Sequence, residues 1–161
     1  VAAAVGVRMA PQSKGQGMAT ARDNPYGAYN FLVEIDGVTS AGFSEVSGLS
    51  VEVGVIEYRN GNDKANSVRK LPGLHKVGDV TLKRGMIGDT ALFAWLRAVT
   101  QGSADVRNVA IVLLDETHTP VLRWLLLRAW PSKWEAAAFK ATGNEVAIES
   151  LTLACERIEI D

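Results

Sequence analysis

Apolar and polar residues alternate along several stretches of the chain, as they do in half-buried β-strands. The first such stretch runs from Tyr29 to Ile35, where the odd-numbered residues form an apolar face. Asp36-Gly37 follows it directly. This dipeptide predicts a two-residue hairpin turn, because both of its residues tolerate positive φ, and the returning strand would begin near Val38.

A second alternating stretch covers Val51–Tyr58, and its odd-numbered positions begin with three valines. The polar segment Arg59–Gly73 follows without any apolar period, which predicts a long loop of the kind that is commonly functional. The next segment, Lys76–Arg84, is predicted to be a strand that pairs with the Val51 strand across this loop. The loop is basic on balance, with Arg59, Lys64, Arg69 and Lys70 set against Asp63.

One segment has helical spacing. Asp89 is a suitable N-cap and Gly102 stands where a helix often ends in glycine. The pattern predicts a helix over about residues 89–100 that places Trp95 against the sheet. Its apolar stripe consists of Leu92, Trp95, Leu96 and Val99.

The remaining segments have strand character. Val106–Asp115 and Val121–Trp130 are rich in β-forming residues, and Pro131 is predicted to end the second of them. The last segment, Glu145–Asp161, changes its apolar phase twice, which predicts one long strand with bulges or bends. The expected fold is mainly β: an antiparallel two-sheet β-barrel or sandwich of about seven strands with one flanking α-helix.

The chain divides into two parts of unequal length. Residues 1–25 have no hydrophobic period and predict an extended N-terminal arm, and residues 26–161 form the β-barrel domain. The 17 Lys and Arg residues and 18 Asp and Glu residues leave a net charge of -1, so no overall basic field attracts nucleic acid. No apolar run is long enough for a membrane span, and we expect no membrane anchoring. The lone Cys155 is predicted to act as a small apolar residue in a strand.

The sequence contains no residue pattern typical of a catalytic or metal site. His75 and His118 are the chain's two histidines and both are predicted in loops, so no zinc site is expected. Phosphate-binding and nucleophile-elbow motifs are absent from the sequence. Glu145 and Glu149 would stand roughly 13 Å apart on one strand, too far for a glycosidase pair, and are interpreted as a solvated face. We therefore predict no catalytic residue, no cofactor and no metal.

Several segments, taken in order, carry a resemblance to a known family. The segments are NPYGAYNFLVEIDG (Asn24 to Gly37), AGFSEVSGLSVEV (Ala41 to Val53), EYRNGND (Glu57 to Asp63), RKLPGLHKVGDVTLKRGMIGD (Arg69 to Asp89) and AWPSKWEAAAFKATGNEVAIESLTLACERI (Ala129 to Ile158). Their combination resembles the tail tube proteins of contractile-tailed phages and the inner tube proteins of extracellular contractile injection systems. These proteins are related in turn to the type VI secretion tube protein.

The resemblance implies a structural protein and not an enzyme. Six copies would form a ring, and the rings would stack into a tube inside a contractile sheath, with baseplate or initiator and terminator proteins at the tube ends. Effector protein or DNA would pass through the lumen. Assembly would take place in the bacterial cytoplasm, and the tube would belong to a phage virion or to an injection particle that is released or stays with the cell. The long loop would reach from one ring to the next, with inter-ring contacts at Tyr58, Arg59, Asp63, Lys64, Arg69 and Lys70.

Two alternatives remain open from the sequence. Within the family, the chain could form the tube-initiator ring at the baseplate. From another class of protein, a monomeric ligand-binding β-barrel would have the same strand pattern but would enclose an apolar cavity. Phage and injection-system tubes, and DNA and protein cargo, fit the resemblance equally.

Overall fold

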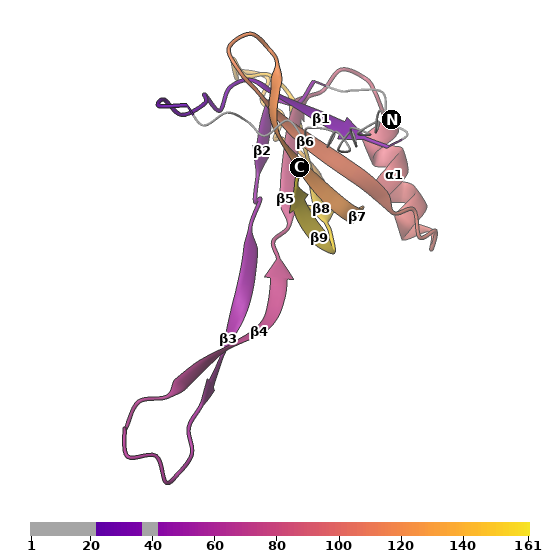
Figure 1. Ribbon diagram of the computed structural model, residues 1–161. Coiled ribbons are helices and arrows are strands. Elements are labelled where there is room, and N and C mark those ends of the chain that lie inside the picture. Colours follow the sequence, from indigo (N-terminus) through magenta and orange to yellow (C-terminus); the bar gives the residue numbers. More distant parts are fainter. Residues whose placement is uncertain (1–21, 37–41) are drawn as a thin grey trace, which may run out of the picture.

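A computed structural model of the chain describes residues 22–36 and 42–161. Nine β-strands and one α-helix lie along these residues (Figure 1). The strands are β1 (Phe31–Ile35), β2 (Glu45–Ser47), β3 (Val51–Tyr58), β4 (Arg69–Val77), β5 (Val80–Gly85), β6 (Arg107–Leu114), β7 (Pro120–Ala136), β8 (Ile148–Ala154) and β9 (Arg157–Ile160). The helix, α1 (Ala91–Thr100), follows β5. The predicted class, mainly β and antiparallel with one helix, is confirmed.

Seven strands form a continuous antiparallel path in the order β1-β6-β7-β8-β5-β2, with β9 added beside β7. The 17-residue β7 belongs to both halves of this path. Up to Ala129 it pairs with β6 and β9, and from Trp130 onward it pairs with β8. We call β1, β6, β9 and the first part of β7 half-sheet A, and β2, β5, β8 and the rest of β7 half-sheet B.

The two half-sheets meet where β7 bends. Arg128 has a φ of 54°, and the pairing register with β8 shifts between Pro131 and Lys133. The prediction that Pro131 ends the strand is wrong. Proline lacks the N–H that a regular ladder needs, but strands tolerate proline beside a bulge; Pro131 stands opposite Leu153 directly before the extra residue Ser132, and β7 continues through it.

A single hydrophobic core joins both half-sheets and α1. Trp95, 1% exposed, packs into it, which confirms the predicted placement, and its indole Nε1 donates a hydrogen bond to the Asp105 carbonyl at 2.8 Å. Asp89 Oδ1 accepts a hydrogen bond from the Ala91 backbone N–H at 2.9 Å, although Thr90 occupies the N-cap position. Gly102 follows the helix with a φ of +88°, as the sequence predicted.

The returning strand of the hairpin predicted at Asp36-Gly37 would begin near Val38, which lies outside the described residues. Among the described strands, β1 pairs with β6. The last segment forms two strands, β8 and β9, instead of one bent strand. This change follows from the bend in β7, because its first part pairs with β9 and its second part pairs with β8.

Most of the predicted N-terminal arm, residues 1–21, also lies outside the described residues. Within the rest, Arg22 forms a two-pronged ion pair with Glu116 at 2.9 and 3.0 Å and stacks over the Tyr26 ring. The division into an arm and a barrel domain stays a prediction.

Strands β3 and β4 pair only with each other and form a two-stranded ribbon that projects from the body (Figure 1). They continue β2 and β5, because Ser47 pairs with Thr81 and Val51 pairs with Val77 in the same register. The predicted pairing across the long loop is correct only at Lys76 and Val77, because the rest of the predicted strand Lys76–Arg84 forms β5, which pairs with β2 and β8. The loop is also shorter than expected, since β4 already begins at Arg69.

Gly48 lies at the point where the ribbon leaves the body. Its φ is +88°, and a Cβ there would lie 2.2 Å from the Asp79 carbonyl oxygen. We expect Gly48→Ala to lower the free energy of unfolding by about 1–3 kcal/mol, because it combines left-handed strain with a backbone clash. Urea denaturation would measure the loss. Gly42→Ala is the matched control, since a Cβ at Gly42 meets nothing within 4 Å, and an equal loss in both variants would contradict this role for Gly48.

Candidate functional site

The ribbon exposes apolar side chains that a solitary molecule would normally cover. Every residue of β3 is exposed, and Leu74 on β4 is 91% exposed. An isolated two-stranded hairpin is marginal in water, and contiguous exposed apolar surface marks an interaction site. The exposed apolar residues of the ribbon strands are Val51, Val53, Val55, Ile56, Tyr58, Leu71 and Leu74.

The apolar surface of the ribbon changes face halfway along its length. Near the body, one face carries Val51, Val53 and Val55, while Glu52 opposite Lys76 occupies the other. Toward the tip the arrangement is reversed. The second face there carries Ile56, Leu71 and Tyr58, and the first face carries Glu57 opposite Lys70. A ribbon with apolar patches on both faces is suited to contacts on both sides.

A β-bulge marks the middle of the ribbon. Val53 pairs with His75 and Val55 pairs with Pro72, so β4 has one more residue than β3 between these pairs. Bulges bend a strand and redirect side chains, and Leu74 lies within this one. Leu74 is therefore a single aliphatic side chain that stands out from the ribbon.

The six residues predicted from the sequence as inter-ring contacts all lie at the ribbon tip, in the loop 59–68 or in the strand ends beside it. Arg59 donates hydrogen bonds to the carbonyls of Ala65 and Asp63, each at 3.0 Å, and so holds the loop in shape. Asp63 also accepts a hydrogen bond from the Asn60 backbone N–H at 3.0 Å. Part of this set thus shapes the loop itself.

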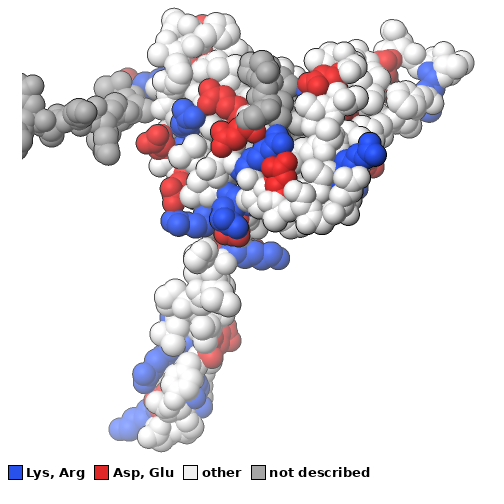
Figure 2. Space-filling model, turned by 90° about the vertical axis from the view of Figure 1, so that its right-hand side faces the viewer, with Lys and Arg blue, Asp and Glu red and all other residues white. Residues whose placement is uncertain are grey.

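The other predicted contacts present charge to the surroundings. Arg69 lies 3.6 Å from Asp63 but its side chain stays 64% exposed, and Lys64 and Lys70 are exposed. Figure 2 shows basic side chains gathered along the ribbon and near its tip. Their role between rings stays a proposal.

A second candidate surface is the outer face of half-sheet B. It is polar in its central part, where four side chains carry hydroxyl groups and two positive and two negative side chains give no net charge. Lys83 lies 3.4 Å from Glu45, and Lys133 lies 3.1 Å from Glu135. The residues of this central part are Glu45, Ser47, Thr81, Lys83, Lys133, Glu135, Ser150 and Thr152.

Arg84 and Glu149 form a buried ion pair that the sequence analysis missed. Their side chains are 1% and 6% exposed, and Arg84 Nε donates a hydrogen bond to Glu149 Oε1. Trp134 Nε1 donates to the other carboxylate oxygen at 3.0 Å, and Arg84 also bonds the Asp89 carbonyl at 3.0 Å. The interpretation of Glu149 as part of a solvated face is wrong. The partner lies 65 positions earlier in the chain, so local spacing gives no signal for it.

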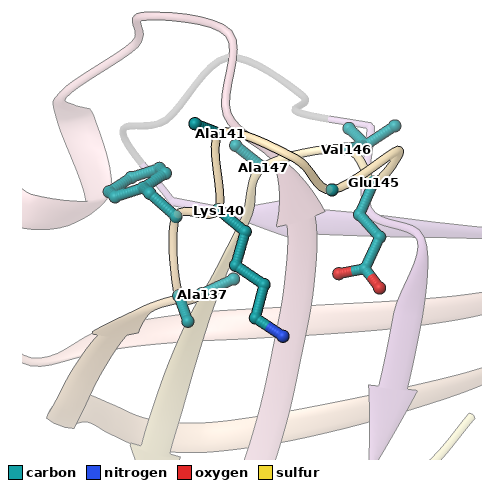
Figure 3. Close-up of a pocket in the computed structure, with 9 residues that line it drawn as sticks. Ala137, Lys140, Ala141, Glu145, Val146 and Ala147 are labelled. Carbon is teal, nitrogen blue, oxygen red and sulfur yellow. The ribbon is translucent and has the colours of Figure 1, made fainter.

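An apolar pocket of about 350 Å³ opens beside this ion pair. Met86 and Ile87 line one part of it, and the rings of Phe93 and Trp134 meet edge to face at 5.2 Å. We call these four residues the socket. Next to it, residues 137–147 arch beyond the strand ends and enclose a second hollow of about 480 Å³, with Lys140 and Glu145 on opposite sides (Figure 3).

Chemical groups for catalysis do not converge in the described part of the chain. Within residues 22–36 and 42–161, no group of three or more His, Cys, Asp and Glu side chains is placed to hold a metal ion. His75 lies on the exposed ribbon and His118 in the β6–β7 turn. Cys155 packs against the core as predicted, and burial raises the pKa of its thiol, so it is a poor nucleophile. No helix among the described residues is long and apolar enough to cross a membrane.

Comparison with known proteins gives consistent matches. The family described as "T4-like virus tail tube protein gp19" matches residues 27–159. A chain in the extended PVC sheath-tube complex of an extracellular contractile injection system has a TM-score of 0.78 and 28% identity, over 86% of this chain and 93% of that chain. A chain in the anti-feeding prophage baseplate has a TM-score of 0.77 and 27% identity, over 86% and 97% of the two chains.

More distant matches bear on the fold alone. Hcp1 from Flavobacterium johnsoniae has a TM-score of 0.52 and 10% identity, over 82% of this chain and 94% of that chain. The search of curated proteins gives no match.

Proposed function

Because the chain belongs to the T4-like virus tail tube protein family, we propose that it forms the inner tube of a contractile injection system, with six copies in each ring and each ribbon reaching into the next ring. It is a tail tube protein, structural and not enzymatic. The mechanical role needs stiff contacts within and between rings. No bond is made or broken.

The observation that carries this proposal is the exposed ribbon. Its apolar side chains are outside the core of their own chain, and the body has strand edges that further strands could join. Exposed edges and apolar patches on a soluble protein invite unlimited association unless a specific partner covers them. A closed ring of identical copies covers the edges, and stacking covers the ribbon.

The outer face of half-sheet B is the best candidate for the channel wall. Half-sheet B has four strands, so six copies would supply about 24 strands spaced about 4.8 Å apart. Tilted by about 40°, they would enclose a bore of roughly 45–50 Å measured between backbones. Hydroxyl groups and balanced charges on this face would neither hold acidic cargo nor repel it. Effector protein or DNA could then pass without strong binding.

The partners follow from the similar structures. One of them is a sheath-tube complex, one a baseplate and one a tube-terminating cap. We propose a contractile sheath around this tube, with baseplate and terminator proteins at its two ends. Assembly would occur in the bacterial cytoplasm, and the finished tube would serve in a phage-like or extracellular particle.

The second candidate within the family is a tube-initiator ring, and the similarity to a chain in a baseplate favours it. The two functions differ in the length of the assembly. Negative-stain microscopy of the purified protein should show long tubes of stacked rings. Isolated rings would support the initiator, and single compact molecules would rule out both and revive the monomeric ligand-binding barrel.

Charge at the ribbon tip provides a direct test of stacking. We expect Arg69→Glu combined with Lys70→Glu to block stacking, because it turns a basic tip acidic, while circular dichroism shows an unchanged fold. The control exchanges the two residues, Arg69→Lys with Lys70→Arg, and should stack normally. Tubes of normal length from the charge-reversed variant would rule out an electrostatic role for the tip.

A further inference from the structure

We propose that Leu74 of one copy inserts into the socket of a copy in the adjacent ring. This inference rests on the proposed stacking and names the contact that holds two rings together. When identical subunits stack head to tail, each chain carries both halves of the repeated contact. A surface that receives the ribbon must therefore exist on this same chain.

The socket lies at the end of the body opposite the ribbon. The ribbon leaves half-sheet B next to Val80, at the start of β5, and the socket segment begins just after Gly85, at its end. Six residues of strand separate these points, about 20 Å. The body is therefore directional: the ribbon projects from one end (Figure 1), and the socket lies at the other.

The recess end is also apolar where it meets solvent. Ile87 is 74% exposed, and Phe139 and Val146 on the neighbouring segment are 76% and 74% exposed. The Met86 backbone N–H donates to the Ala147 carbonyl at 2.9 Å, so the two segments lie side by side. Like the ribbon, this surface is suited to an apolar partner.

The socket is preformed, and the Trp134 indole and the Glu149 carboxylate that border it are already hydrogen-bonded. The edge-to-face contact fixes the rings of Phe93 and Trp134. The indole N–H of Trp134 is already bonded to Glu149, and Glu149 is paired with Arg84. An aliphatic side chain that fills the socket therefore leaves Trp134, Glu149 and Arg84 hydrogen-bonded to one another.

Leu74 fits this recess better than the other exposed ribbon residues. It is the most exposed of them, and the bulge turns it away from the regular ribbon faces. It lies within β4, three residues and about 10 Å of strand from Val77, where the ribbon joins the body. If the body of a second copy stacks directly against the ribbon end of the first, the socket of the second copy would lie within this distance of about 10 Å. The tip loop of the first copy would then extend further along the second.

Cross-linking tests the contact in assembled tubes. In a Cys155→Ala background, which removes the native thiol, we combine Leu74→Cys with Ile87→Cys and treat tubes with a short bismaleimide. The expected result on a denaturing gel is a ladder of covalent oligomers, because each copy links to the next. Each single-cysteine variant should remain a monomer band.

A substitution provides the energetic test. Leu74→Asp should lower the association constant between rings by at least about tenfold, the size expected for one lost buried leucine, while rings still form. Leu74→Met, which keeps an apolar side chain of similar volume at the same position, is the matched control and should have less effect. Tubes that form normally without a ladder, or that tolerate Leu74→Asp, would overturn this contact and leave the proposed function intact. Absence of tubes from the unmodified protein would overturn both.

Discussion

Replacing residues 54–74 with an Asn-Gly turn should abolish tube formation and leave the body folded. Val53 and His75 form the last regular pair before the bulge, so a two-residue turn closes the shortened hairpin there. No residue of the ribbon belongs to the hydrophobic core, and the melting temperature should change by only a few degrees. Thermal unfolding followed by circular dichroism measures stability, and negative-stain microscopy measures assembly.

The truncated protein also tests the direction of assembly. It lacks the projecting half of the head-to-tail contact but keeps the recess at its other end. Mixed with intact protein before assembly, it should enter tubes at one end only and shorten them as its proportion rises. Tubes of normal length from the truncated protein alone would show that the ribbon does not connect rings.

The ribbon marks the limit of what sequence periodicity can predict. Alternation at Val51–Tyr58 predicted a strand correctly, but its partner was placed too late in the chain, since most of β4 lies in the segment predicted as loop. Alternation predicts that one face of a strand is buried, but it does not show whether residues of the same chain or of another chain bury that face. The valines of β3 therefore resembled core residues in the sequence, although the structure leaves them exposed.

The candidate site was predicted in part for a related reason. The charged residues of the tip, such as Arg69 and Lys70, lie in one polar segment and were found by inspection of that segment. The socket combines Met86 and Phe93 with Trp134, which come from three different elements, and only the folded sheet brings them together. A strand can be predicted from residues that are close together in the sequence. The lining of a pocket depends on which strands and helices the fold places side by side.

Arg84→Met should cost about 3–5 kcal/mol of unfolding free energy, the loss typical of a buried ion pair that loses one partner. Methionine keeps most of the aliphatic length of arginine, so the effect reports the lost charge and hydrogen bonds. Glu149, 5% exposed, would keep the hydrogen bond from the Trp134 indole N–H but lose its charged partner. Urea denaturation would measure the loss, and Arg123→Met, which breaks the exposed pair with Glu34, should cost at most about 1 kcal/mol.

A second substitution separates charge from packing. Combining Arg84→Met with Glu149→Gln removes the buried charge but keeps an amide oxygen for Trp134, so at least about 1 kcal/mol of the loss should return. A double variant no more stable than Arg84→Met would mean that packing, and not the unpaired carboxylate, causes the loss.

The same ion pair links folding to assembly. Arg84 also bonds Asp89, and this contact anchors the segment that carries Met86 and Ile87, so Arg84→Met should weaken ring stacking in protein that is still folded.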